Sequence, residues 1–116
     1  MDKIYHLSSC TTCRRILQEI HADKKGIVLQ DIKGEKITPA QLDELKEKAG
    51  SYEALFSRRA IKYKEMGLKD EQLTEADYRR LILEEYTFLK RPVVLAGDRI
   101  FIGSEKKTLT ALKEAF

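Results

Sequence analysis

The sequence has few residues of the kinds that build metal sites or disulfide frameworks, and it has no long apolar run. Its only cysteines are Cys10 and Cys13, and its only histidines are His6 and His21. A structural zinc site usually needs four such ligands at characteristic spacings, so a zinc site is disfavoured and we expect no bound metal. No apolar stretch approaches the roughly 18 residues that span a bilayer, and no secretory signal pattern opens the sequence. We therefore expect a cytoplasmic protein without membrane contact.

Neither sign of charge is in large excess. The 22 basic and 19 acidic residues leave a net charge of +3, which is too small by itself to indicate nucleic-acid binding. The basic pairs at 14–15, 79–80 and 106–107 lie among acidic residues on predicted helices, without interleaved aromatic side chains. They are typical of solvated helix faces, so we expect no direct nucleic-acid contact.

The length and composition are those of one compact domain. A chain of 116 residues with 42% hydrophobic content can bury roughly two-thirds of its unfolded surface without the help of a disulfide. No internal repeat, low-complexity segment or linker divides the sequence. We therefore predict a single domain over residues 1–116.

The N-terminal third has the pattern strand, helix, strand. A short β-prone run over 3–7 ends at two serines, and an apolar stripe then predicts a helix over 12–22. Basic residues and a glycine at 24–26 indicate the end of that helix, before a second strand over 27–32. Because one helix connects them, the two strands are predicted to be parallel with a right-handed crossover. The stripe consists of Cys13, Ile16, Leu17 and Ile20.

The rest of the sequence predicts a helical block followed by a hairpin and a final helix. Thr38, Pro39 and Gln41 form a helix start, and that helix ends before Gly50. Two short helices are predicted within 51–73 and a longer one from Thr74 to about residue 89, which Pro92 terminates. The hairpin joins 93–96 to 99–102 through Gly97-Asp98, and the last helix carries Leu109, Leu112 and Phe116 on one side.

The two cysteines form a Cys-x-x-Cys pair with Cys10 at or just before a helix N-terminus. Unpaired N–H groups and the helix dipole stabilise an anion there, so Cys10 can ionise near neutral pH and act as a nucleophile. Cys13, one turn later, can attack a sulfur adduct on Cys10 and form an intramolecular disulfide. Arg14 lies beside the pair and can add to its positive field. The alternative is that both cysteines are buried and inert.

Three segments together are similar to the arsenate reductase (ArsC) family, which includes the Spx regulators. They are IYHLSSCTTCR at 4–14, SRRAIKYKEMGL at 57–68 and LKRPVV at 89–94, in the family's order. The similarity covers essentially the whole chain. It implies an α/β, thioredoxin-like fold, with a small mixed four-stranded sheet in the order βαβ…ββα and a helical insertion at approximately 38–90.

The resemblance also implies roles for individual residues. Cys10 matches the family's catalytic cysteine. Arg59 and Arg91 match arginines that stabilise the thiolate and bind an oxyanion, for which the planar guanidinium fork is suited. Arg58 is a one-residue-shifted alternative to Arg59. Pro92 matches a site-shaping proline that is typically cis.

The sequence departs from the glutaredoxin-coupled arsenate reductases, which resemble His-Asn-Pro-x-Cys-x-x-Ser, at two places. Leu7-Ser8 stands where they have Asn-Pro, and the segment 101–104 lacks their third oxyanion arginine. Cys13 instead resembles the Spx-like branch. We expect a thiol-dependent oxidoreductase acting on a small oxyanion or a disulfide, with no bound cofactor and with glutathione or a thioredoxin- or glutaredoxin-type protein as electron donor. The alternative is an Spx-like redox-sensing regulator that binds RNA polymerase.

Overall fold

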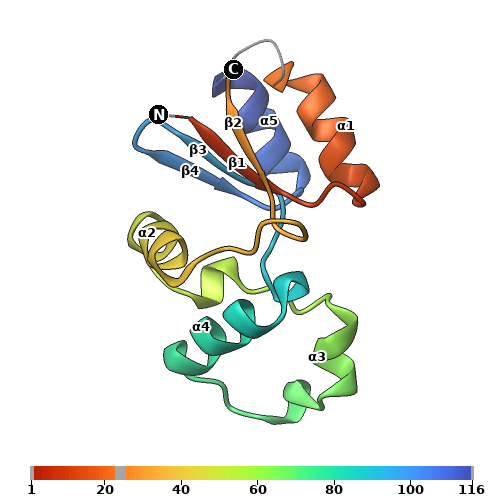
Figure 1. Cartoon of the computed structure of the whole chain (residues 1–116), viewed down its shortest axis with the longest axis vertical. Helices are drawn as coiled ribbons and strands as arrows, with labels where there is room; N and C mark the ends of the chain where they lie inside the picture. The colour runs from red at the N-terminus through yellow and green to blue at the C-terminus, as the bar shows by residue number, and fades with distance from the viewer. Residues whose placement is uncertain (1, 23–25, 116) are drawn as a thin grey trace. The chain divides into compact units, whose positions relative to one another are not determined.

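A computed structural model describes residues 2–22 and 26–115. The chain divides into two compact units, one from Met1–Glu35 with Arg91–Phe116 and one from Lys36–Lys90. We call them the sheet unit and the helical unit. Figure 1 shows the elements of both: β1 (Lys3–His6), α1 (Thr11–Glu19), β2 (Val28–Asp31), α2 (Pro39–Ala49), η2 (Glu53–Leu55), α3 (Ile61–Glu65), η3 (Leu68–Asp70), α4 (Glu75–Glu84), η4 (Tyr86–Phe88), β3 (Val93–Ala96), β4 (Arg99–Ile102) and α5 (Lys106–Ala115), where η marks a 3-10 helix.

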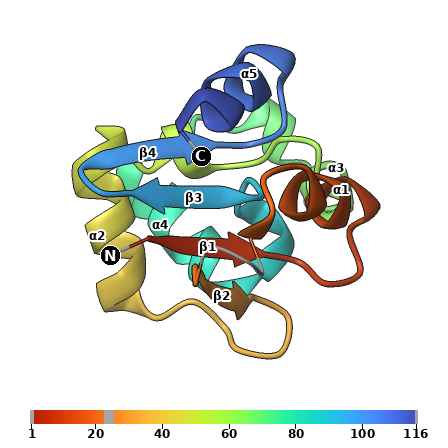
Figure 2. The same cartoon turned by 90° about the horizontal axis from the view of Figure 1, so that it is seen from above.

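The sheet unit contains a mixed four-stranded sheet in the order β2-β1-β3-β4, which is visible from above in Figure 2. Strands β1 and β2 are parallel, with Lys3 opposite Val28 and His6 opposite Asp31. Strand β3 is antiparallel to both β1 and β4. The βαβ and ββα halves and the parallel pair therefore agree with the prediction. In the hairpin turn, Gly97 adopts φ 61°, a left-handed conformation that glycine accepts without steric cost.

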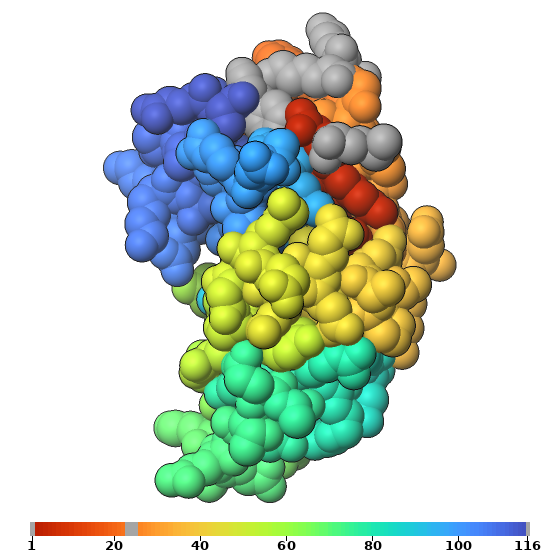
Figure 3. All heavy atoms as spheres, turned by 90° about the vertical axis from the view of Figure 1, so that its left-hand side faces the viewer, coloured from red at the N-terminus to blue at the C-terminus, as the bar shows by residue number. Residues whose placement is uncertain are grey.

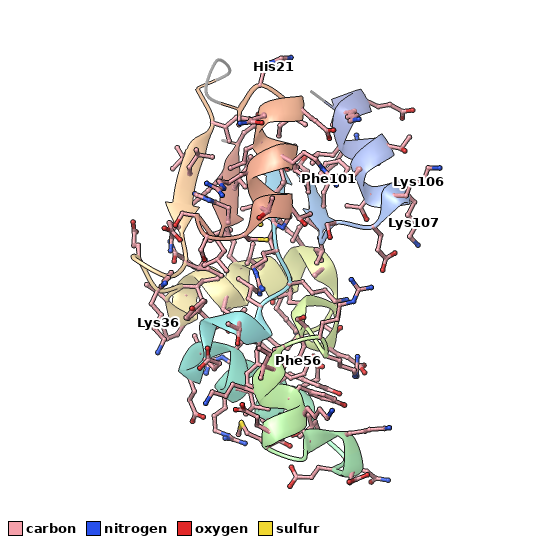
Figure 4. All side chains as sticks on the ribbon, turned by 90° about the vertical axis from the view of Figure 1, so that its right-hand side faces the viewer. His21, Lys36, Phe56, Phe101, Lys106 and Lys107 are labelled. Atoms are coloured by element: carbon pink, nitrogen blue, oxygen red, sulfur yellow. The ribbon has the colours of Figure 1, made fainter. Side chains whose placement is uncertain are left out.

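Helices α1 and α5 cover one face of the sheet. Alternate strand residues and the apolar stripe of each helix meet in one core, and α5 lies beside β4 (Figures 2 and 3). Figure 4 shows Phe101 between the two helices, whereas Lys106 and Lys107 point outward from the start of α5. The buried members of this core are Ile4, Ile16, Ile20, Ala22, Ile27, Val94, Phe101 and Leu112.

The helical unit is built around Phe56, which is labelled in Figure 4. Its ring stacks on Phe88 at 5.0 Å between centroids and meets Tyr78 at 4.9 Å and Tyr63 at 6.0 Å. Helices α2 and α4 begin with capping boxes, in which a threonine and the residue three positions later bond to each other's backbone N–H. The predicted start at Thr38 is confirmed.

Two predicted helix ends are wrong. Helix α1 ends at Glu19 rather than near 22, because the backbone reaches the left-handed region at His21 (φ 56°). The basic residues at 24–25 lie outside the described residues. Helix α4 ends at Glu84 rather than near 89. Apolar residues continue at helical spacing past Glu84. However, Ser57 donates its N–H to the Phe88 carbonyl at 2.6 Å, and this tertiary pairing overrides the local pattern.

None of the helices that the structure describes is both long enough and apolar enough to cross a membrane.

Candidate active site

The two cysteines lie at the start of α1, directly after a tight turn that follows β1. Cys10 is the N-cap residue with extended backbone (φ −88°, ψ 114°). Its N–H donates to the Leu7 carbonyl at 2.9 Å, and its own carbonyl accepts the Arg14 N–H at 3.1 Å. Cys13 lies one helical turn further on and is completely buried, whereas Cys10 is partly exposed. The prediction that Cys10 immediately precedes the helix is confirmed.

The surroundings of Cys10 favour its thiolate. Burial raises the pKa of Cys10, but hydrogen bonds from the Cys13 N–H, the Cys13 thiol and the Thr12 N–H, together with the positive charge of Arg91, outweigh it. The pKa of Cys10 is therefore lowered. This is the environment of a reactive cysteine rather than of an inert buried thiol.

Cys13 is in the opposite situation. Burial raises its pKa most, and the hydrogen bond to Cys10 and the negative charge of the Cys10 thiolate raise it further, to about 12. Hydrogen bonding from the Leu7 backbone and the charge of Arg91 only partly oppose this. At neutral pH Cys10 therefore has the larger thiolate fraction of the two, and Cys13 is protonated.

Arg91 reaches this pair because of the sheet register. Strand β3 runs antiparallel to β1, with Val93 opposite Tyr5, so the residues before β3 lie at the end of β1 from which the Cys10 turn departs. The Arg91–Pro92 peptide bond is cis, and Pro92 is buried. Two predicted site residues from the far end of the sequence are thereby placed in the same unit as the cysteines.

The sequence of the chain is similar to the sequences of known proteins over most of its length. The ArsC family model matches residues 5–112. The chain belongs to the ArsC family. An arsenate reductase of Neisseria meningitidis is 28% identical over 115 residues, covering 95% of this chain and 96% of that protein. The global transcriptional regulator Spx 2 of Bacillus anthracis is 26% identical over 108 residues, covering 89% and 79%.

The architecture also agrees with solved ArsC structures. An arsenate reductase from Vibrio cholerae superposes with a TM-score of 0.79 at 19% identity, covering 99% of this chain and 97% of that one. The predicted α/β, thioredoxin-like fold with its mixed four-stranded sheet is confirmed.

The three other arginines predicted from the ArsC resemblance or from the sequence have distinct surroundings. Arg14 is exposed on α1 and is not among the groups that chiefly shift the pKa of Cys10. Arg58 donates to Glu53 at 2.7 Å and to the Tyr78 hydroxyl at 3.1 Å, so it is engaged within the helical unit. The neighbouring Arg59 is exposed, and its backbone N–H donates to the Ser57 hydroxyl at 3.4 Å. Arg59 belongs to the helical unit, and its role in the site stays a prediction.

Sequence reasoning missed a polar group beside the Cys10 turn. Asp31, at the end of β2, accepts the N–H of Ser8 at 3.3 Å and that of Lys33 at 3.2 Å, and it also bonds the Ser8 hydroxyl. His6 lies opposite Asp31 in the parallel register. Its buried Nδ1 has no hydrogen-bond partner among the residues that the structure describes. The predicted parallel strands could have indicated this contact, because the carboxyl ends of neighbouring parallel strands meet at one edge of a sheet.

No cluster of three or more potential metal-ligating side chains occurs in the described ranges 2–22 and 26–115.

Proposed function

We propose that this member of the ArsC family is a thiol-dependent oxidoreductase in which Cys10 is the nucleophile and Cys13 the resolving cysteine. The observation that carries the proposal is the asymmetry of the pair: the pKa of the partly exposed Cys10 is lowered, and that of the fully buried Cys13 is raised. A thiolate is the attacking species in thiol–disulfide exchange, so these environments support Cys10 as the group that attacks first.

With a disulfide substrate the electrons balance in two steps. The Cys10 thiolate attacks one substrate sulfur, which forms a mixed disulfide and releases the other substrate half as a thiolate. Cys13 then loses its proton and attacks the Cys10 sulfur, which forms the Cys10–Cys13 disulfide and releases the second half. The substrate has gained two electrons, and an external thiol reductant, glutathione or a thioredoxin- or glutaredoxin-type protein, returns them to the enzyme. An oxyanion substrate requires the same two electrons.

The wild-type protein allows a direct test. We expect glutathione disulfide to convert reduced protein to the Cys10–Cys13 disulfide, with transient glutathionylation of Cys10 but not of Cys13. Mass spectrometry of the two cysteine peptides after quenching measures both species, and a parallel reaction with arsenate detects oxyanion chemistry. If Cys10 alkylates at pH 6 no faster than a model thiol and neither reagent produces the disulfide, the proposal is wrong.

Arg59 provides a second test, with Arg58 as its matched neighbour. Because glutathione disulfide and arsenate are anionic and the Arg59 side chain is exposed, we expect Arg59→Ala to slow their reaction about tenfold. Arg58→Ala removes a half-exposed ion pair with Glu53 and should cost at most about 1 kcal/mol of stability with little change in rate. Stopped-flow rates and thermal unfolding of both variants distinguish binding from packing. Equal rate losses in the two variants would contradict the assignment to Arg59.

A second candidate function is redox-sensing regulation of the Spx kind. It is favoured by the 26% identity to Spx 2 and by the second cysteine, Cys13, where the pattern of the glutaredoxin-coupled arsenate reductases has serine. In this reading the same disulfide changes a binding surface, and RNA polymerase is the partner. Pull-down of purified RNA polymerase by the reduced and the oxidised protein tests it. Enrichment that depends on the redox state supports regulation, and no enrichment in either state contradicts it.

A further inference from the structure

We propose that Asp31 is a positioning residue that holds the turn from Leu7 to Cys10 and thereby presents the Cys10 sulfur at the start of α1. Its carboxylate accepts the Ser8 N–H at 3.3 Å and also bonds the Ser8 hydroxyl. Both donors belong to the residue that follows Leu7. The inference rests on the proposed function only in taking Cys10 as the reacting group.

The Asp31 carboxylate is itself held in place. Asp31 is paired with His6 in the parallel register of β1 and β2, and the next residue, Ile32, donates its N–H to the His6 carbonyl at 2.9 Å. The same carboxylate oxygen accepts the Lys33 N–H at 3.2 Å, and the Asp31 carbonyl accepts the Glu35 N–H at 2.7 Å. The titratable side chain that acts on the Asp31 carboxylate is that of His6 on β1, whereas Lys33 contacts the carboxylate through its backbone N–H. A rigid acceptor at the end of β2 can restrain a neighbouring turn, which a mobile surface carboxylate cannot.

The turn that Asp31 restrains is the one that contains the nucleophile. The Leu7 carbonyl accepts the Cys10 N–H at 2.9 Å, which makes Leu7–Cys10 a four-residue β-turn with Ser8 in its second position. The backbone of Leu7, in the same turn, also forms a hydrogen bond with the Cys13 sulfur. Fixing Ser8 therefore fixes the backbone that contacts both cysteines.

The residue type at position 8 explains why such a restraint is needed. The second position of type I and type II turns favours proline, whose ring fixes φ near −65°. Ser8 does not have a positive φ, since the only non-glycine residue with one among the described residues is His21. A serine fixes φ only through external hydrogen bonds, and Asp31 supplies their acceptor.

Positioning and charge predict opposite results when Asp31 is removed. A carboxylate that acted on Cys10 only through its negative charge would disfavour the thiolate, so its removal would shift the pH profile of Cys10 reactivity downward. A carboxylate that holds the turn keeps the Cys10 sulfur near the N–H groups of Thr12 and Cys13. Its removal then shifts the profile upward.

The test measures the alkylation rate of Cys10 by iodoacetamide against pH, with quantification of the Cys10 peptide by mass spectrometry. We expect Asp31→Ala and Ser8→Ala each to slow the reaction at pH 6 by about threefold to tenfold, with the midpoint moved upward. Asp31→Ala removes both bonds to Ser8, whereas Ser8→Ala removes only the bond from the hydroxyl, so the double Ala variant should be no slower than Asp31→Ala alone. Ser8→Pro in the Asp31→Ala background should restore the rate to within about twofold.

Asp98→Ala is the matched control, because Asp98 is an exposed aspartate of the same unit in the turn between β3 and β4. It should leave the profile unchanged. A downward midpoint in Asp31→Ala, multiplying effects of the two Ala substitutions, or no restoration by Ser8→Pro overturns the inference. If Asp31→Ala does not fold, Ser8→Ala and the Pro-containing double variant decide. A wild-type Cys10 that is no more reactive than a model thiol overturns the proposed function instead.

Discussion

Cys10→Ser is expected to abolish formation of the Cys10–Cys13 disulfide and the proposed reductase activity, with a loss of roughly 10³-fold or more. Serine places a hydroxyl where Cys10 has a thiol with a lowered pKa, and at neutral pH that hydroxyl is neither ionised nor able to form a disulfide. Incubation with glutathione disulfide followed by mass spectrometry measures the result. The variant should acquire no glutathione on either cysteine position.

The matched control is Cys13→Ser, which changes the same atom in the resolving cysteine. A serine hydroxyl can still donate a hydrogen bond to the Cys10 sulfur, so Cys10 should keep most of its reactivity. The variant should then accumulate the mixed disulfide on Cys10, because nothing resolves it. If Cys13→Ser instead prevents glutathionylation while Cys10→Ser does not, the roles of the two cysteines are reversed.

The parts of the fold that were predictable are those governed by local chemistry. The capping box at Thr38 and the glycine of the hairpin turn each restrict the backbone strongly enough to mark a boundary. The end of α4 was not predictable in this way. Its apolar spacing continues past Glu84, and only the pairing of Ser57 with Phe88, which are distant in the sequence, shows why the helix stops.

In the candidate site, too, the residues fixed by local sequence were predictable, and the residues brought together by strand pairing were not. The Cys-x-x-Cys spacing at a helix start was sufficient to place Cys10 and Cys13, because the relevant N–H donors are adjacent in the sequence. The proximity of Arg91 followed only from the family resemblance, and the antiparallel pairing of β3 with β1 gives its physical basis. The predicted parallel pair placed the ends of β1 and β2 at one edge of the sheet, but Asp31 was missed because its partner, Ser8, is 23 residues away and their contact depends on the exact register.

Arg91→Ala should shift the pH dependence of Cys10 reactivity upward and slow alkylation at pH 6 by about tenfold. The positive charge of Arg91 contributes to the lowered pKa of Cys10, so its removal raises that pKa and reduces the thiolate fraction below the midpoint. Above the midpoint Cys10 is ionised in both proteins, and the two rates should converge. The measurement is the rate of iodoacetamide modification of the Cys10 peptide between pH 5 and about pH 9, a range that brackets the ordinary thiol pKa.

Two control variants separate charge from packing. Arg91→Lys keeps a positive charge and should retain most of the shift, although its single ammonium cannot reproduce the planar fork. Arg14→Ala removes an exposed arginine that is next to Cys13 in the sequence, and it should move the midpoint less than Arg91→Ala. Equal shifts from Arg14→Ala and Arg91→Ala would indicate a diffuse positive field around α1 rather than a specific contact. Added salt distinguishes these cases further, because screening weakens a diffuse field between exposed charges more than it weakens a partly buried pair.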